Sequence, residues 1–551
     1  MRRLVRMVRE IEEGESQLKF TRRWVMSHSE ILSKAARLSV LVSLVLLVIA
    51  SARYAYADSN EMFNVKEFGA KGNGISLDTK YIQAAIDSCY ESGGGTVFFP
   101  RGRFLAGSLQ LKSNVFLKLS SGARILGSEN ISDYPDSCLI YADGATNVGI
   151  VGSGFIDGQG ETFWKGKERP YVRPKFLIYF KSCQNAKIEG INIRNSPRFD
   201  IYLRECNLVR VEGISIINDR ESPNTDGIDP SGSSNVFISN CYIQSGDDAI
   251  CLKSNETGAT TSNIVVSDCI LETDDSAIKC GTASWGAIQN CTFNNIIIKN
   301  SRYGISLFMK DGGKFEGLKF SNILLQTETE MYAKPGRYSF PIFMDIEKRT
   351  EESSLGQIRN ISFDNIDIET YNGNCLFLGQ PGDEIRGVTM NDIRMKVLKR
   401  IDYSKRHKPR GTRTLTNIAS NDYAYISSHI TLAYVNGLTI RNFTIKDDDP
   451  ATDFERYSFW GKDIQNVLID GMKTEQIIEN KSYPTIEMID GKNVIIRDCQ
   501  PDSNQVGFLE VDGESSHSIK LIDNDVSGIA KDVILGDGAP KDAVHISDIR
   551  R

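Results

Sequence analysis

A polar turn followed by alternating apolar and polar residues recurs along the chain from about residue 145 to residue 525. The segments 234–241 (SNVFISNC) and 262–269 (SNIVVSDC) are close copies, and 435–446 (VNGLTIRNFTIK) repeats the same pattern. Apolar residues at every second position indicate strands with one buried face. The repeats are too short to contain a crossover helix. We therefore predict an all-β fold, a right-handed parallel β-helix whose coils share one continuous core.

An amphipathic segment precedes these repeats. Residues 77–91 place apolar side chains on one face of a helix, with Asp78 as a candidate N-cap, and three glycines follow at 93–95. The end of a solenoid exposes strand edges, and these need a cover. We therefore predict that this helix caps the N-terminal end of the β-helix.

The first 57 residues have the pattern of an export signal. An apolar run at 38–50 follows basic residues, and the Ala-Tyr-Ala triplet at 55–57 resembles a cleavage site. The run is too short to span a bilayer comfortably, so we predict a signal peptide within 1–57, with Met26 as its start, and a single β-helix domain at 58–551. This prediction implies a secreted or periplasmic protein without stable membrane association. An uncleaved signal anchor is the alternative.

The charge of the chain argues against two classes of partner. The whole chain has a net charge of −6, and residues 1–57 carry ten basic and five acidic side chains, which leaves −11 for the remainder. An acidic exported protein has no general attraction for nucleic acid or for an anionic membrane. We therefore expect no nucleic-acid partner, and an anionic substrate would need a local basic patch.

The cysteines do not form a metal-binding pattern. All eleven follow residue 57, and most lie within apolar strands, so we expect buried thiols that behave as small apolar groups. An odd number leaves at least one unpaired, and a disulfide such as Cys241–Cys269 stays open. The sequence contains no CxxC motif and no Cys/His cluster. We therefore predict no structural zinc. We also expect no cofactor.

Two short acidic motifs are the candidates for catalysis: Asn-Thr-Asp-Gly at 224–227 and Gly-Asp-Asp-Ala at 246–249. Asp226 and Asp248 are 22 residues apart, which is close to the repeat period, so neighbouring coils would bring them side by side. Crowded carboxylates cannot all ionise cheaply. One can therefore act as an acid while the others activate water, which is what cleavage of a glycosidic bond requires. The alternative is a structural turn cluster, in which the aspartates only accept backbone hydrogen bonds.

The ordered motifs resemble those of glycoside hydrolase family 28, the polygalacturonase-like pectin hydrolases. The matching motifs are FNVKEFGAKG at 63–72, GGTVFFP at 94–100, IDGQGE at 156–161, Arg-Pro at 173–174, Asn-Ser-Pro at 195–197 and the two acidic motifs. The resemblance implies an inverting, metal-free hydrolase with Asp247 as the general acid and with Asp226 and Asp248 activating water. A diagonal across neighbouring coils would supply the roughly 6.5–9.5 Å that an inverting pair of carboxylates needs.

The sequence departs from the family where the sugar would be recognised. Ser276 stands where the family commonly has His, and Ser306 and Phe308 stand where Arg and Lys usually hold the galacturonate carboxylate. Lys310, two positions further on, is a candidate replacement, although Lys lacks the planar fork of Arg. We expect retained hydrolysis with an altered choice of substrate, so a branched pectin fragment or another uronic-acid glycan fits as well as plain polygalacturonan. The candidate substrate-binding residues are Asn224, Lys253, Ser276 and Lys310.

Two segments interrupt the repeats. Residues 326–356 and 394–424 lack the strand pattern, and we predict long loops there. The second segment contains a run of basic residues. It is either a solvated loop or a rim that contacts an acidic polysaccharide.

Two other functions remain compatible with a β-helix. A polysaccharide lyase would hold calcium with carboxylates and use Arg or Lys as a base. A non-catalytic glycan-binding protein would show no turnover. In each case the expected partner is a polysaccharide or oligosaccharide, and we expect the chain to act as a monomer.

Overall fold

The computed structural model describes most of the chain after residue 61. The described residues are 62–327, 339–371, 374–398, 423, 426–447, 456–475, 482–503 and 505–551. They fall within one compact unit, Glu61–Arg551. A separate unit, Met1–Asn60, lies outside the described residues, and so does the predicted signal peptide at 1–57 with its start at Met26.

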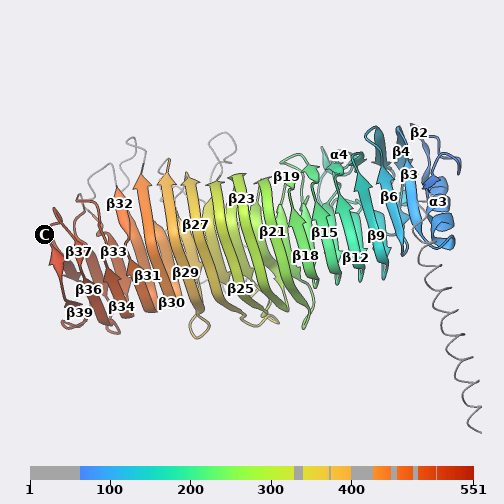
Figure 1. Ribbon diagram of the computed structural model, residues 1–551. Coiled ribbons are helices and arrows are strands. Elements are labelled where there is room, and N and C mark those ends of the chain that lie inside the picture. Colours follow the sequence, from blue (N-terminus) through green and yellow to red (C-terminus); the bar gives the residue numbers. More distant parts are fainter. Residues whose placement is uncertain are drawn as a thin grey trace, which may run out of the picture. The chain divides into compact units, whose positions relative to one another are not determined.

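Successive coils of parallel strands build the described unit. Figure 1 shows them stacked from β1 (Met62–Asn64), in blue, to β39 (Val544–Ile546), in red. β15 (Asn207–Glu212) pairs in parallel with β18 (Ser234–Ser239) of the next coil, and β18 pairs in the same way with β21 (Thr260–Thr273). The prediction of an all-β, right-handed parallel β-helix is confirmed.

Apolar side chains on the inner face of each coil form one continuous core. Val209, Val236 and Ile264 occupy matching positions on three consecutive coils, and each is fully buried. Arg210, the strand neighbour of Val209, points outward and is exposed. Burying one such apolar side chain contributes about 1.5–3 kcal/mol. The period-two alternation that predicted strands is therefore also what holds the coils together.

The eleven cysteines are all buried thiols within this core or beside it. The Cys241 thiol donates to the backbone oxygen of Ser239, and the Cys269 thiol donates to that of Ser267, each at 3.2 Å. Cys241 and Cys269 are thus not joined by a disulfide. They pack as small apolar groups, as the sequence suggested.

A column of asparagines bends consecutive coils at the same place. Asn235 Nδ2 donates to Asn207 Oδ1 at 2.7 Å, and Asn263 Nδ2 donates to Asn235 Oδ1 at 3.1 Å. Asn235 and Asn263 have left-handed backbones, with φ of 55° and 56°. Asn adopts this conformation more readily than most residues that carry a side chain. Asn235 and Asn263 therefore each bend the chain, and each also bonds the asparagine of the preceding coil and so helps to fix the register.

The predicted capping helix is α3 (Thr79–Glu91), and its apolar face is buried against the first coils. Asp78 stands at the N-cap position, but its carboxylate accepts hydrogen bonds from the backbone N–H groups of Lys71 (2.8 Å) and Gly72 (2.9 Å) instead of from the helix. Asp78 therefore ties the preceding loop to the start of α3. In the part of the chain that the structure describes, no helix is long and apolar enough to cross a membrane.

Residues 326–356 are not a single loop, contrary to the prediction. β26 (Phe340–Ile346) pairs with β24 (Tyr303–Met309) as a regular rung, and all its residues are buried. Both faces of β26 are covered, so its apolar residues follow one another without the alternation that marks a half-buried strand. The second predicted loop, 394–424, begins inside β29 (Ile385–Val397), and most of its remainder lies outside the described residues.

The asparagine column gives a test of how the coils are held in register. Asn235→Ala should lower the free energy of unfolding by about 2 kcal/mol, because it strains a left-handed backbone position and removes the ladder hydrogen bonds. Asn235→Gly should lower it less, because glycine adopts a positive φ without strain. Urea denaturation followed by circular dichroism measures both losses. Equal losses for the two variants would show that backbone strain plays no part.

Candidate active site

The two acidic motifs lie on neighbouring coils. Asp226 precedes β17 (Ile228–Ser231), and Asp247 and Asp248 precede β20 (Ile250–Ser254). One carboxylate oxygen from each of the three aspartates lies within 4.8 Å of the others. The structure therefore brings together residues that are 22 positions apart in the sequence.

The register between the coils causes this proximity. Ile228 pairs with Ile250, and the Gly227 N–H donates to the backbone oxygen of Asp248 at 2.9 Å. Asp226 and Asp248 thus hold the same position on adjacent coils, one strand spacing of about 4.8 Å apart. The nearest carboxylate oxygens of the three aspartates lie within 4.8 Å of one another. The separation of roughly 6.5–9.5 Å expected for an inverting pair refers to the carboxyl groups of acid and base, and it stays a prediction.

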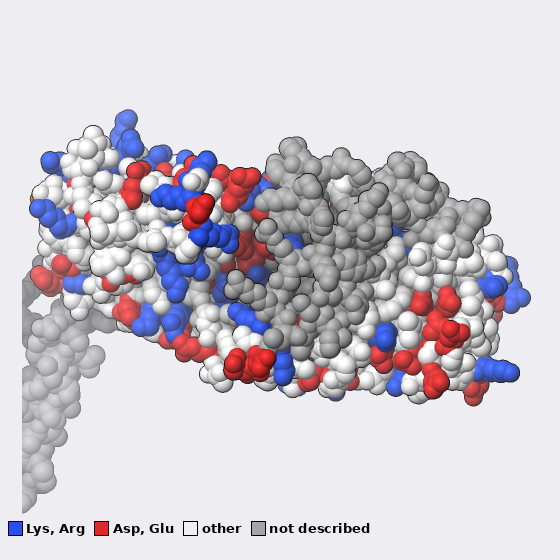
Figure 2. Space-filling view, turned by 180° about the vertical axis from the view of Figure 1, so that it is seen from behind, with Lys and Arg blue, Asp and Glu red and all other residues white. Residues whose placement is uncertain are grey.

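Basic side chains accompany the aspartates, and Figure 2 shows Lys and Arg gathered beside Asp and Glu near the middle of one face. Lys253 Nζ lies 2.7 Å from Asp226 Oδ2, and Lys279 Nζ lies 2.8 Å from Asp248 Oδ2. Asp226 and Asp248 are only 4% and 2% exposed, so these ammonium groups stabilise carboxylate charges that water reaches poorly. Asp247 is partly exposed, and no ion pair joins it to another described residue.

The surroundings of Asp247 favour its protonated form. Removal from water raises the pKa of Asp247 well above its usual value, and the negative charges of three neighbouring aspartates raise it further. These neighbours are Asp226, Asp248 and Asp275. The Lys279 ammonium acts in the opposite direction. A carboxyl group held protonated in this way can donate a proton, so the charge pattern separates one candidate acid from two ion-paired carboxylates.

Asn224 contacts the candidate acid. Its backbone is left-handed, with φ of 56°, and its Nδ2 donates to Asp247 Oδ2 at 3.3 Å. Asn224 Oδ1 accepts a hydrogen bond from Arg173 at 2.8 Å, and Arg173 also donates to the backbone oxygens of Pro197 and Pro223, both at 2.6 Å. Arg173 therefore links two turns that are distant in sequence, one at Pro197 and one at Pro223 and Asn224. The sequence analysis placed Arg173 in a motif but gave it no role, because nothing in the spacing relates it to Asn224.

Gly246 lets the two acidic turns pack closely. A Cβ atom at this position would lie 2.2 Å from the backbone oxygen of Ser222, which is far inside contact distance. The Gly246 N–H donates to Thr225 Oγ1 at 3.0 Å and so links the two turns directly. The glycine beside Asp247 is therefore required by the close approach of neighbouring coils.

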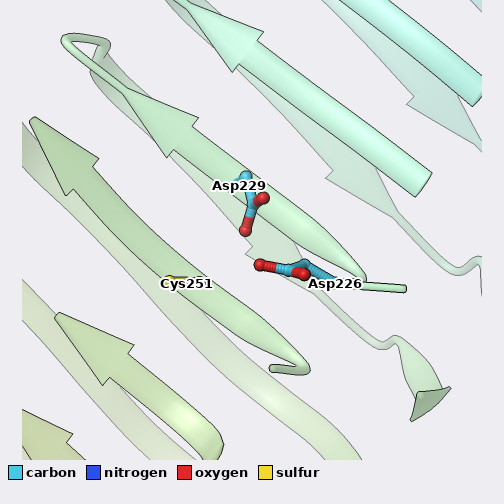
Figure 3. Close-up of side chains that lie close together, drawn as sticks. All are labelled: Asp226, Asp229 and Cys251. Carbon is cyan, nitrogen blue, oxygen red and sulfur yellow. The ribbon is translucent and has the colours of Figure 1, made fainter. Parts of the chain in front are cut away.

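Two groups of side chains have the spacing of a metal site. The first is Asp226, Asp229 and Cys251, shown in Figure 3, where the two carboxylates point toward one another and Cys251 lies on the next strand. Lys253 Nζ is 2.7 Å from Asp226 and 2.8 Å from Asp229, so an ammonium already supplies the counter-charge. The Cys251 thiol donates to the backbone oxygen of Gly281 at 3.0 Å, and burial raises its pKa well above the usual value. This group is therefore a poor metal site, since a thiol ligates as its thiolate. The second group is the three clustered aspartates themselves.

Two of the predicted substrate-binding residues, Lys253 and Ser276, contact protein side chains instead of an open surface. Lys253 is committed to Asp226 and Asp229, so it positions the cluster. Ser276 follows Asp248 at the matching place on the next coil, but its side chain is fully buried and its hydroxyl lies 3.4 Å from Asp275 Oδ1. Neither side chain offers an uncommitted group to a sugar at an open surface.

Lys310 does not replace the missing carboxylate clamp. Its side chain is fully buried, and its Nζ contacts Asp345 and lies 2.6 Å from Glu347. Burial raises the pKa of Asp345 to about 7, and Lys310 opposes this. The prediction was wrong because β26, which supplies Asp345 and leads directly into Glu347, was taken for part of a loop. With β26 packed as a rung, Lys310 points into a buried ion cluster.

Aromatic clusters flank the aspartates on both sides. The cluster toward the N-terminus is centred on Phe176 and Tyr202, with Phe199 packed against it and partly exposed. The cluster toward the C-terminus contains Tyr303 and Phe308, which are 5% and 7% exposed. Phe199 is therefore a partly exposed ring on the coil before the aspartates, whereas Tyr303 and Phe308 are buried.

Comparison with known sequences identifies a family. Glycosyl hydrolases family 28 matches residues 89–409, more than half of the chain. A protein named "Probable polygalacturonase" from Vitis vinifera is 27% identical over 361 residues, which cover 59% of this chain and 72% of that protein. An "Exo-poly-alpha-D-galacturonosidase" from Dickeya chrysanthemi is 30% identical over 255 residues, which cover 34% of this chain and 41% of that protein.

Solved structures share the fold. The family 28 exopolygalacturonase of Yersinia enterocolitica superimposes with a TM-score of 0.53 at 20% identity, covering 75% of this chain and 79% of that chain. The exopolygalacturonase of Thermotoga maritima gives a TM-score of 0.54 at 22% identity, covering 61% of this chain and 87% of that chain. At these identities the likeness establishes the β-helix alone.

The role of Lys310 can be tested through stability. Lys310→Met should lower the free energy of unfolding by about 3–5 kcal/mol, because it leaves the buried charges of Asp345 and Glu347 uncompensated. The control is Lys314→Met, which breaks a partly exposed ion pair with Glu316 (2.7 Å) and should cost less than about 1 kcal/mol. Denaturant unfolding measures both. Similar losses for the two variants would contradict the buried ion cluster.

Proposed function

The chain belongs to glycosyl hydrolases family 28, whose model matches residues 89–409, and we propose that it cleaves a pectic or related uronic-acid-containing polysaccharide. Membership of this family makes it a glycoside hydrolase that acts on O-glycosyl bonds. The polygalacturonase and galacturonosidase names of its relatives support this substrate class. The observation that carries the proposal is the group of three aspartates within 4.8 Å, of which Asp226 and Asp248 are paired with lysines and Asp247 is not.

Asp247 acts as the general acid in this mechanism. It gives its proton to the glycosidic oxygen, and the leaving sugar departs as an alcohol. The raised pKa of Asp247 and its partial exposure support this role, and the hydrogen bond from Asn224 orients the carboxyl group. Asn224 is then a positioning residue, because it acts on the substrate only through Asp247.

Asp226 and Asp248 orient the attacking water and take its proton. One water that donates two hydrogen bonds of about 2.8 Å spans acceptor oxygens about 4.5 Å apart, which suits carboxylates on adjacent coils. Lys253 and Lys279 hold the two carboxylates in place. The nearest-oxygen distance does not decide between inversion and retention, so inversion of configuration rests on the likeness to the family.

The export prediction remains part of the proposal. Residues 1–57 form a signal peptide that starts at Met26, and 58–551 form one catalytic domain that acts as a secreted or periplasmic monomer. The apolar run and the Ala-Tyr-Ala triplet support this.

A calcium-dependent lyase is the second candidate, because three clustered carboxylates have the spacing of a metal site. A lyase also needs an uncommitted base. Lys253 and Lys279, the cations in contact with the cluster, each bind an aspartate instead. The geometry therefore favours hydrolysis.

Asp247→Asn should lower kcat by roughly three orders of magnitude or more, because an amide cannot donate the proton. Reducing ends released from a panel of pectic and other uronic-acid glycans, in the presence of a chelator, measure the rate. The matched control is Asp143→Asn, which removes an exposed carboxylate that lies 2.9 Å from Lys181. It should keep the wild-type rate.

Three outcomes of this experiment would count against parts of the proposal. Activity that needs calcium and yields an unsaturated uronate would indicate a lyase. Undiminished turnover by Asp247→Asn would remove Asp247 from the acid role. A first-formed product with the anomeric configuration of the substrate, detected by NMR, would replace inversion by retention.

Lys279→Met should move the alkaline limb of the kcat/KM profile to higher pH, on the order of one pH unit. The Lys279 ammonium lowers the pKa of Asp247, so its loss raises that pKa further. Asp247 works in its protonated form, and the rate falls as pH rises through its pKa, so a higher pKa extends activity upward. Lys299→Met, which removes a charge paired with Glu272 at 3.1 Å, should leave the limb in place. An unmoved limb in Lys279→Met would argue against Asp247 as the acid.

A further inference from the structure

Three described cations beside the cluster are already paired with carboxylates. The pairs are Lys253 with Asp226, Lys279 with Asp248 and Arg302 with Asp275. Ser306 and Phe308, at the positions of the family's usual clamp, are 0% and 7% exposed. These described side chains leave no uncommitted cation for a substrate carboxylate, although the proposed substrate carries one on each uronate residue.

A different set of cations lies on the N-terminal side of the cluster. Arg169, Arg173 and Arg198 form no ion pair with a carboxylate among the described residues. The three are close enough to repel one another: burial first, and then the charges of Arg198 and Arg169, lower the pKa of Arg173 to about 10. The charge of Asp226 acts on Arg173 in the opposite direction. This corner therefore carries three arginines that are not ion-paired with described carboxylates, and they form the local basic patch that an acidic chain needs to hold an anionic glycan.

Arg198 lies next to a side chain that binds the acidic cluster. Its guanidinium carbon lies 4.8 Å from the centre of the Phe199 ring, and Lys253 Nζ lies 4.9 Å from the same centre. Lys253 in turn binds Asp226. The Phe199 ring supports the flat guanidinium. The Arg198 side chain is partly exposed and forms no ion pair with a described carboxylate, so it can meet an anionic ligand.

The register of the coils places Arg198 relative to the proposed acid. Ile201 pairs with Ile228, and Ile228 pairs with Ile250. Counting back three residues from Ile201 and from Ile250 places Arg198 and Asp247 at the same position, two coils apart. Two strand spacings amount to about 10 Å. A sugar residue that adjoins the glycosidic bond at Asp247 and the long Arg198 side chain together span this distance.

We propose that Arg198 binds the carboxylate of a uronate residue adjacent to the scissile bond, on the N-terminal side of the aspartates. This assignment rests on the proposed function. The planar fork of Arg198 supplies two parallel hydrogen bonds to the carboxylate, and Arg173 and Arg169 add positive potential. This assignment places recognition of one carboxylate on the coil before the aspartates, and the substrate needs an unesterified carboxylate at this subsite.

The test separates binding from catalysis by using Asp247→Asn protein. Its two probes are trigalacturonate and the same trisaccharide with every carboxyl group reduced to an alcohol, titrated by calorimetry. Adding Arg198→Gln should raise the Kd of the acidic probe roughly 10- to 100-fold and leave that of the neutral probe unchanged. Arg198→Lys, which keeps the charge without the fork, should give an intermediate Kd.

Arg210→Gln is the matched control. Arg210 also stacks on a phenylalanine, Phe237, at 5.8 Å, but it lies on the strand β15, away from the aspartates. Its loss should change neither Kd. An Arg198→Gln protein that binds the acidic probe as tightly as the parent, or that loses both probes equally, overturns the assignment, and so does a parent that binds neither probe.

The same variants distinguish this assignment from the proposed function. Acidic-probe binding that depends on Arg198, in a protein whose wild-type form hydrolyses no uronic-acid glycan, would overturn the proposed function alone. Hydrolysis with a KM that Arg198→Gln does not change would overturn the Arg198 assignment alone.

Discussion

The hydrogen-bonded step from one coil to the next is the constraint on which the rest of the structure depends. Left-handed asparagines such as Asn235 turn each coil at the same place, and their side-chain amides bind the asparagine of the coil before. This ladder leaves the strands no freedom to slip. Because the register is fixed, Asp226 and Asp248 come to matching positions in the turns that precede two neighbouring strands.

Burial decides which charges remain available. A carboxylate removed from water needs a partner, and Lys253 and Lys279 serve Asp226 and Asp248 in this way. Lys310 serves Asp345 and Glu347 under the next coils. Asp247 is left with an amide donor and acidic neighbours, which is the setting of a proton donor. The three aspartates therefore differ in their proposed roles because their surroundings differ.

The sequence was most informative where one face of a strand meets water. The alternation of apolar and polar residues predicted the coils around Val236, and the 22-residue interval predicted that Asp226 lies beside Asp248. The sequence pattern failed where both faces of a strand are covered, as in β26. Lys310 was therefore predicted to face the substrate, whereas its side chain is buried. The pattern was also silent on Arg173, because a contact across 51 residues with Asn224 leaves no periodic trace. Such contacts depend on turn conformation, which a strand pattern does not encode.

The regular ladder has an evolutionary consequence. Every coil follows the same path, so a duplication that inserted one whole coil between Asp226 and Asp248 would find its place in the stack with core and turns intact. It would nonetheless separate the two carboxylates to about twice the strand spacing, too far to share one water. A descendant of this kind would be well folded and chemically inert, which is a direct route from an enzyme to a lectin-like scaffold.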